Sequence, residues 1–291
     1  MAEQHGTYYV PDHSIWPIVG TLGLFGFAVG SLNFSSLWGM IVFSLGALTL
    51  LVMLFGWMHD VVRESGADLY DAQMGRTFRW GMFWLLLGET FFFGTALGAL
   101  IYVRFASLPW MAGTGSGGSI MTHYVLWPNF QNTWPLLVGP NPNAFPLPKM
   151  TPTAWGLPLL NTLILLMSAI TAIFSWRALL TKKQQLAIAG MSVTLLLGLA
   201  FLVSQVYFLF QLATKYGVTI ASGIYGSLFY FLNTFHLIHI VVGLILFAVI
   251  LLLTIKNHFN AERTFGFSAS VLFWSFLTVI WLFIFVCVYW V

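Results

Sequence analysis

One glutamate and two histidines have the types and positions that would support chemistry inside an apolar segment. Glu89 lies in the apolar stretch Trp80–Val103. On a helix it would be roughly 14 Å from the start of that stretch. His236 and His239 lie in another apolar stretch, and their spacing places both on one helix face. An ionisable group at membrane depth is costly unless it is neutral or paired, so these three side chains are the candidates for function.

Metal binding is the most specific function that these residue types suggest, but the chain has too few candidate ligands for a haem-copper or dinuclear copper site. A haem-copper centre buried in helices needs several more histidines, and only His236 and His239 lie in an apolar stretch. A dinuclear copper site needs a pair of cysteines, whereas Cys287 is alone. We therefore expect no metal site and no bound cofactor. Two interpretations stay open: a hydrogen bond from Glu89 to a histidine across two helices, or three separately satisfied polar groups.

The composition identifies the kind of protein that must position these residues. The chain is 59% hydrophobic and only 7% charged, whereas soluble domains contain about 25% charged residues. Such a chain cannot present a solvated surface, so we expect an integral membrane protein. Its net charge of +3 includes no basic patch, so no nucleic-acid partner is expected.

Runs of about 20 apolar residues are the signature of membrane helices. They predict an all-α polytopic membrane protein with seven transmembrane helices: Ile15–Phe34, Trp38–Met58, Trp80–Val103, Gly156–Trp176, Leu186–Leu212, Ile220–Ile255 and Phe267–Trp290.

The distribution of Lys and Arg predicts the orientation of the chain. With the N-terminus inside, the inner side holds Arg63, Arg76, Arg79, Arg177, Lys182, Lys183, Lys256 and Arg263, and the outer side holds Arg104, Lys149 and Lys215. Cytoplasmic loops carry the excess of Lys and Arg, so the chain is predicted to run N-in/C-out.

The spacing of the apolar runs predicts a two-helix plus five-helix arrangement. Residues 1–58 hold the N-terminal segment and a two-helix bundle, because the first two runs are joined by only a few residues. Residues 59–79 are a polar cytoplasmic connecting loop, and residues 80–291 hold the five-helix bundle. The bundle includes a long Pro-rich periplasmic loop, 105–155. This loop is either an ordered cap over the helix ends or a docking surface for a partner.

Two further patterns concern membrane packing and lipid. Trp57, Arg63 and Glu64 follow the second apolar run, and Arg suits phosphate while Trp suits the membrane interface. The segment is either a lipid-headgroup site or an ordinary solvated helix end. Gly26-x-x-x-Gly30 and Gly94-x-x-x-Gly98 have the spacing that permits close helix contacts.

Motifs along the whole chain resemble those of the cytochrome c oxidase subunit III family. Their order and spacing carry the resemblance, and the matching segments are Trp57–Ser65, Arg79–Met82, Gly88–Phe93, Leu157–Thr162, Gly223–Ser227, Phe235–Gly243, Phe265–Phe267 and Trp281–Phe283. The resemblance implies a subunit without a redox centre, docked beside the catalytic haem-copper subunit and enclosing lipid between its two bundles. It also implies that this chain supports the proton uptake, the stability and the O2 access of the catalytic subunit.

The resemblance also implies roles for individual residues. The membrane glutamate of the family corresponds to Glu89, and its His-x-x-His corresponds to His236 and His239. Its headgroup residues correspond to Trp57, Arg63 and Glu64. Ionisable residues that are usual in the family are replaced here by Ser175, Trp176, Phe208, Ser268, Ser275 and Thr278.

We therefore expect an accessory subunit III of a proton-pumping terminal oxidase in a bacterial inner membrane. Its expected partners are catalytic subunit I, in direct contact, subunit II and phospholipids, with haem and copper in the partner subunits. The alternatives are subunit III of a quinol oxidase, a stand-alone transporter and an intramembrane hydrolase. A transporter favours inverted repeats and broken helices, neither of which is clear here. A hydrolase needs a Ser nucleophile facing a His base, and no exposed Ser-Gly turn is obvious.

Overall fold

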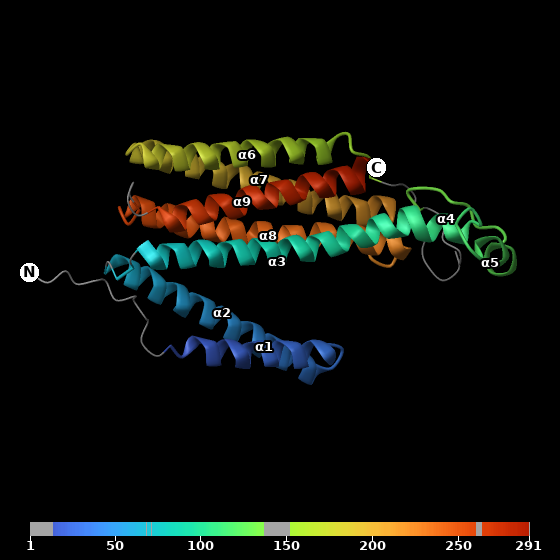
Figure 1. Ribbon diagram of the computed structural model, residues 1–291, viewed down its shortest axis with the longest axis horizontal. Helices are drawn as coiled ribbons and strands as arrows, with labels where there is room; N and C mark the ends of the chain where they lie inside the picture. The colour runs from blue at the N-terminus through green and yellow to red at the C-terminus, as the bar shows by residue number, and fades with distance from the viewer. Residues whose placement is uncertain (1–13, 68, 71, 137–151, 260–263, 291) are drawn as a thin grey trace, which may run out of the picture. The chain divides into compact units, whose positions relative to one another are not determined.

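The computed structural model describes residues 14–67, 69–70, 72–136, 152–259 and 264–290, and these residues form helices without any strand (Figure 1). The α-helices are α1 (Trp16–Leu32), α2 (Leu37–Gly66), α3 (Ala72–Tyr102), α4 (Leu108–Met111), α5 (Ser119–Leu126), α6 (Leu157–Leu180), α7 (Gln184–Tyr216), α8 (Gly223–Ile255) and α9 (Phe265–Ile284). Two short π-helices, η1 (Val103–Ser107) and η2 (Phe285–Trp290), follow α3 and α9.

Six helices of the described chain are long and apolar enough to cross a membrane. They are Leu37–Gly66, Gln73–Met111, Leu157–Leu180, Gln184–Tyr216, Gly223–Ile255 and Phe265–Trp290. The first predicted span, Ile15–Phe34, forms the shorter helix α1 of 17 residues. It ends early because the chain turns at Asn33, and Ser36 Oγ then accepts the Gly39 N–H, 3.0 Å away, to begin α2. The chain is thus an all-α membrane protein.

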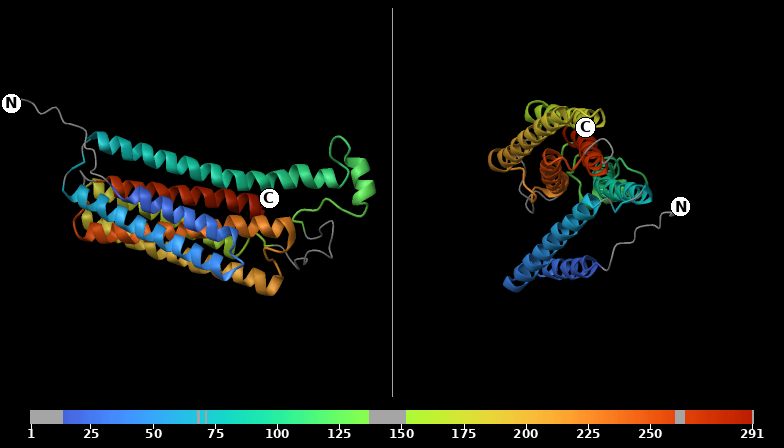
Figure 2. Two further views of the ribbon diagram at one scale, coloured as in Figure 1. Left: turned by 90° about the horizontal axis from the view of Figure 1, so that it is seen from below. Right: turned by 90° about the vertical axis from the view of Figure 1, so that its left-hand side faces the viewer.

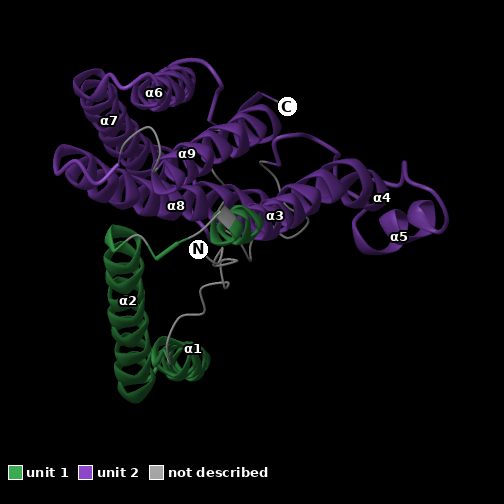
Figure 3. Ribbon diagram, turned by 60° about the vertical axis from the view of Figure 1, so that its left-hand side comes forward, with its two compact units in different colours: residues 1–81 green, residues 82–291 purple. Residues whose placement is uncertain are grey.

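The chain divides into two compact units, residues 1–81 and 82–291 (Figure 3). In the first unit, α1 packs along α2 through glycines of both helices. A Cβ atom at Gly30 would clash with the backbone nitrogen of Phe43, and one at Gly46 with that of Phe27. Small residues allow two helix backbones to approach this closely. The packing role predicted for Gly26-x-x-x-Gly30 is confirmed.

In the second unit, helices α6, α7, α8 and α9 form a closed ring in which each helix packs against the two beside it (Figure 2). Large aromatic side chains fill the ring, and Trp274 and Trp281 are completely buried. Their indole N–H groups donate to Ser168 Oγ and Thr162 Oγ1 of α6, both at 2.9 Å. Buried indoles need such partners, so these two bonds bind α9 to a defined position on α6.

Helix α3 joins the ring through its side chains rather than by close backbone approach. The ring of Phe92 lies 5.1 Å from that of Phe235 and 5.9 Å from that of Phe231, both on α8. A Cβ atom at Gly94 or Gly98 would meet no described atom within 4 Å. Among the described residues of the second unit, no helix therefore packs closely against Gly94-x-x-x-Gly98.

The segment 59–79, expected as a connecting loop, is mostly helical. Helix α2 continues to Gly66 and α3 begins at Ala72, so only residues 67–71 separate them. No proline or glycine occurs from His59 to Ser65, and a helix does not end simply because its residues become polar. Of the loop 105–155, the structure describes residues 105–136 and 152–155, which include α4 and α5. The remaining residues of that loop lie outside the described chain.

Candidate functional site

Glu89 on α3 and His239 on α8 form a pair. The Glu89 Oε2 atom lies 3.0 Å from His239 Nε2, and the two side chains are 27% and 18% exposed. The ring of Phe93, next along α3, lies 5.3 Å from the His239 ring. Of the two interpretations left open by the sequence, the structure agrees with the one in which Glu89 contacts a histidine on another helix.

The second nitrogen of His239 determines how many protons the pair holds. Its Nδ1 lies 2.7 Å from the carbonyl oxygen of Phe235. A carbonyl only accepts hydrogen bonds, so Nδ1 must be a donor. The contact between Nε2 and Glu89 then holds one proton, either as a neutral acid bonded to a neutral imidazole or as a carboxylate bonded to an imidazolium. Both arrangements have zero net charge, which is how an acid is tolerated at membrane depth.

His236 is separate from this pair, although it lies on the same face of α8. It is completely buried, and its Nε2 lies 3.0 Å from the carbonyl oxygen of Leu277 on α9. The rings of Trp281, Phe201 and Phe93 surround it at 5.2, 5.9 and 6.5 Å. The His-x-x-His motif is thus divided: one histidine contacts α3 and the other contacts α9.

The end of α2 carries a second polar group within the first unit. Trp16 Nε1 donates to Asp60 Oδ2 at 2.7 Å, which attaches the start of α1 to α2. Arg63 Nη2 lies 3.8 Å from Asp60 Oδ1, one helical turn away, and the Arg63 side chain is 72% exposed. Asp60 therefore positions Arg63 while leaving most of its guanidinium accessible.

The other two headgroup candidates differ from each other. Trp57 is half-exposed on α2. Glu64 Oε2 accepts a hydrogen bond of 2.8 Å from the Tyr70 hydroxyl, in the short link between α2 and α3. Glu64 thus has a structural partner within the chain, whereas Trp57 and Arg63 present open surfaces.

A buried network that sequence reasoning missed joins four elements of the second unit. Gln205 on α7 accepts from Asn161 Nδ2 at 2.7 Å and donates to Asn233 Oδ1 at 3.0 Å. The Tyr289 hydroxyl donates to Asn233 Oδ1 at 2.7 Å, and Ser204 Oγ donates to Asn161 Oδ1 at 2.6 Å. Three amides in three separate apolar runs were the only signal, and nothing in their spacing indicates that they meet.

The hydroxyl-bearing residues that the resemblance places at ionisable positions of the family are satisfied locally. The hydroxyls of Ser268, Ser275 and Thr278 donate to backbone carbonyls one turn earlier in their own helix. Ser175 Oγ donates to a backbone carbonyl of α7, and Phe208 is buried. These replacements therefore leave no unpaired charge in the ring.

No group of three or more His, Cys, Asp or Glu side chains that could hold a metal ion occurs among the residues that the structure describes. Glu89 and His239 supply one carboxylate and one imidazole, which bond to each other. What this site offers chemically is a shared proton and a cross-helix link.

Comparison with known proteins identifies the family of this chain. The family model of cytochrome c oxidase subunit III matches residues 5–110 and 139–291. Among curated relatives, cytochrome c oxidase subunit 3 of Tetraodon nigroviridis is 31% identical over 297 residues, covering 100% of this chain and 99% of the relative. Those of Formosania lacustris and Danio rerio are each 30% identical with the same coverage. The chain therefore belongs to the cytochrome c oxidase subunit III family.

Proposed function

We propose that this chain is the accessory subunit III of a proton-pumping cytochrome c oxidase. The observation that carries the proposal is the family match, which covers most of the chain in two blocks. Membership in this family makes the chain a non-catalytic subunit of an oxidoreductase complex. Oxygen reduction takes place in a partner chain, subunit I, which holds the haem and copper and which this chain contacts directly, with subunit II in the same complex.

The proposed architecture has seven spans in a two-plus-five arrangement, N-in/C-out. Residues 1–58 hold the N-terminal segment and the two-helix bundle, 59–79 the cytoplasmic connection and 80–291 the five-helix bundle. The division of the chain after Gly81 into two compact units supports this proposal, and so does the inner-side excess of Lys and Arg.

The proposed role of the Glu89–His239 pair is to hold α3 against the ring of four helices. The 3.0 Å contact between the two side chains supports it, because α3 otherwise meets α8 mainly through aromatic rings. By keeping this helix in place, the pair sustains proton uptake and O2 access of subunit I.

Phospholipid is the proposed ligand, with its headgroup at the end of α2. The exposed guanidinium of Arg63 and the half-exposed ring of Trp57 support headgroup binding at the end of α2. Glu64, which bonds to Tyr70, would shape this site rather than contact the headgroup.

The proposed location is a bacterial inner membrane. The named relatives are subunits from eukaryotes, so this proposal rests on the outer segment of the chain. Residues 111–138 lie outside the family match, which supports a longer outer loop than the family requires. The relatives' printed names favour cytochrome c over a quinol as the electron donor.

An optical redox spectrum tests the proposed function. The complex is purified through this chain in mild detergent, and the chain isolated alone is measured beside it. We expect haem bands in the complex and none in the isolated chain. Haem in the isolated chain would contradict a subunit without a redox centre. No haem in either sample, with copurification intact, would favour a stand-alone transporter.

A further inference from the structure

Helix α5 exposes an apolar face that the family match does not include. Ile120, Met121, Tyr124 and Val125 are 69%, 67%, 76% and 65% exposed. Their spacing of one and four residues places them on one face of the helix. They belong to residues 111–138, between the two matched blocks, so this surface is an addition to the family scaffold.

Hydrogen bonds on the opposite face hold α5 in a defined orientation. Ser119 Oγ donates to the carbonyl oxygen of Gly115 at 2.6 Å, and His123 Nδ1 lies 2.9 Å from that of Met111. Ser119 and His123 are four residues apart and therefore lie on one face. Gly113, with φ of 77°, allows the turn that brings α5 back to α4. The apolar residues consequently face away from the chain.

The position of α5 along the chain places it at a membrane boundary. Helical structure continues from Gln73 to Met111, and a span of about 30 Å needs about 20 residues. If the hydrocarbon begins near Trp80, it ends near Tyr102, and α4 and α5 follow at the level of the lipid headgroups. Figure 2 shows α5 running crosswise to α3, as a helix lying in the membrane plane would run.

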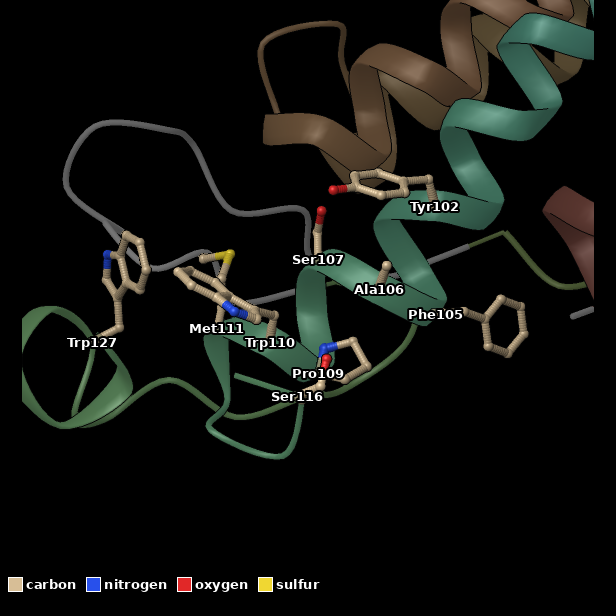
Figure 4. A pocket seen from close by; sticks show the side chains of 10 residues that line it. Tyr102, Phe105, Ala106, Ser107, Pro109, Trp110, Met111, Ser116 and Trp127 are labelled. Carbon is tan, nitrogen blue, oxygen red and sulfur yellow. The ribbon is translucent and has the colours of Figure 1, made fainter. Parts of the chain in front are cut away.

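The surface between α3 and α5 is also apolar and aromatic. A cavity of about 640 Å³ is lined by Tyr102, Phe105, Trp110, Met111 and Trp127, among others, from the end of α3 and the segment beyond it (Figure 4). Tyr102 and Phe105 are 66% and 63% exposed. Exposed aromatic side chains thus extend from the end of α3 into the segment that leads to α5.

The charge pattern distinguishes lipid from protein as the occupant. No Asp, Glu, Lys or Arg occurs from Phe105 to Pro148. A segment in water would contain about a quarter charged residues, and a protein-docking surface has a polar rim. Trp and Tyr are the residues that proteins place at the membrane interface, and Trp110, Tyr124 and Trp127 are present here.

We propose that α5 is an interfacial anchor, with Ile120, Met121, Tyr124 and Val125 inserted into the lipid leaflet at the C-terminal end of α3. Apolar faces of such helices enter the boundary between headgroups and acyl chains by about 5–10 Å. The anchor fixes how deep the C-terminal end of α3 and the segment after it lie in the bilayer. The placement of α5 is independent of which electron donor the oxidase uses.

Spin-label accessibility tests the anchor. In a Cys287→Ser background, single nitroxide labels are placed at Met121→Cys and Val125→Cys, with Lys215→Cys, an exposed position at the end of α7, as the control. The complex is reconstituted in phosphatidylcholine–phosphatidylglycerol vesicles. Collision rates with oxygen, which concentrates in lipid, and with a water-soluble nickel chelate are then compared. Haem content of each preparation verifies that the variants assemble.

We expect the oxygen-to-nickel collision ratio at residues 121 and 125 to exceed that at residue 215 severalfold. Ratios equal to that of the control would place α5 in water and overturn the anchor. Low collision rates with both reagents at 121 and 125 would mean that a protein partner covers the helix, and would overturn it as well.

Discussion

Glu89 and His239 show how one backbone carbonyl determines the chemistry of a buried pair. Because Phe235 accepts from His239 Nδ1, the opposite nitrogen and Glu89 must share one proton. The acid is satisfied within a pair whose net charge is zero. His236, three residues earlier, has a backbone partner instead and contributes to the packing of α9.

Substitution at Glu89 is expected to separate hydrogen bonding from ionisation. Glu89→Gln retains a side chain that can bond to His239, so the complex should assemble and turn over nearly normally. Glu89→Ala leaves His239 Nε2 without its partner, which costs about 1–3 kcal/mol. The measurements are the fraction of this chain retained in the purified complex and the turnover rate. If both variants kept the whole chain in the complex and turned over at the unaltered rate, the role of the pair would be refuted.

The two histidines provide a matched control. His239→Phe removes the partner of Glu89 and should loosen the chain as Glu89→Ala does. His236→Phe replaces a buried imidazole by a ring of similar shape among aromatic neighbours. The Leu277 carbonyl that loses its bond lies within a helix, so this variant should be retained nearly as well as the original chain. Equal losses in both variants would assign the effect to packing alone.

At the level of the helices, two identical glycine spacings have different outcomes. Gly30 lies against the backbone of Phe43 on α2, whereas Gly98 faces no described atom. The spacing of small residues shows where a close approach is possible. Whether a helix occupies that face depends on how the rest of the chain is arranged.

Alanine substitutions should therefore affect the two motifs differently. Gly30→Ala forces α1 and α2 apart, and overpacking of this kind typically costs about 1–3 kcal/mol. Gly98→Ala is the matched control and should be tolerated, because Ala favours helix and its methyl group would meet no described atom of the second unit within 4 Å. Thermal denaturation of the purified complex measures both. A loss at Gly98 as large as that at Gly30 would mean that a partner subunit packs on this face of α3.

Buried side-chain hydrogen bonds join the four helices of the ring. Its indole–hydroxyl bonds and the amide network around Gln205 join α6, α7, α8 and the end of α9. Such a network favours one arrangement of the helices, because each unsatisfied amide in an apolar interior costs free energy. Helix α3 joins this ring mainly through side chains, so we expect loss of the Glu89–His239 pair to affect this helix most.

The proposed N-in/C-out orientation predicts which side of the membrane each connection faces. In a Cys287→Ser background, Lys182→Cys lies between α6 and α7 and Lys215→Cys lies at the end of α7. A membrane-impermeant maleimide added from the cytoplasmic side should label residue 182, and the same reagent added from the outer side should label residue 215. Labelling of residue 182 from outside would reverse the orientation.

The sequence by itself determined the membrane class, the family and the positions of the long helices. Apolar runs of bilayer length leave little choice in a membrane, because helical structure is the way each segment satisfies its own backbone. It also identified Glu89 as a residue that needs a partner. These conclusions depend on local composition and on motif order, which a single chain displays directly.

Only the tertiary structure decided which residues meet across helices. It selected His239 rather than His236 for Glu89 and brought Asn161, Gln205 and Asn233 into one network. Among the described residues of each unit, it placed a helix against the first glycine motif but not against the second. It also extended α2 and α3 through most of the expected loop. Rotation of a helix about its axis is set by packing against neighbours far away in the sequence, and a uniformly apolar helix carries little periodic signal to reveal that rotation.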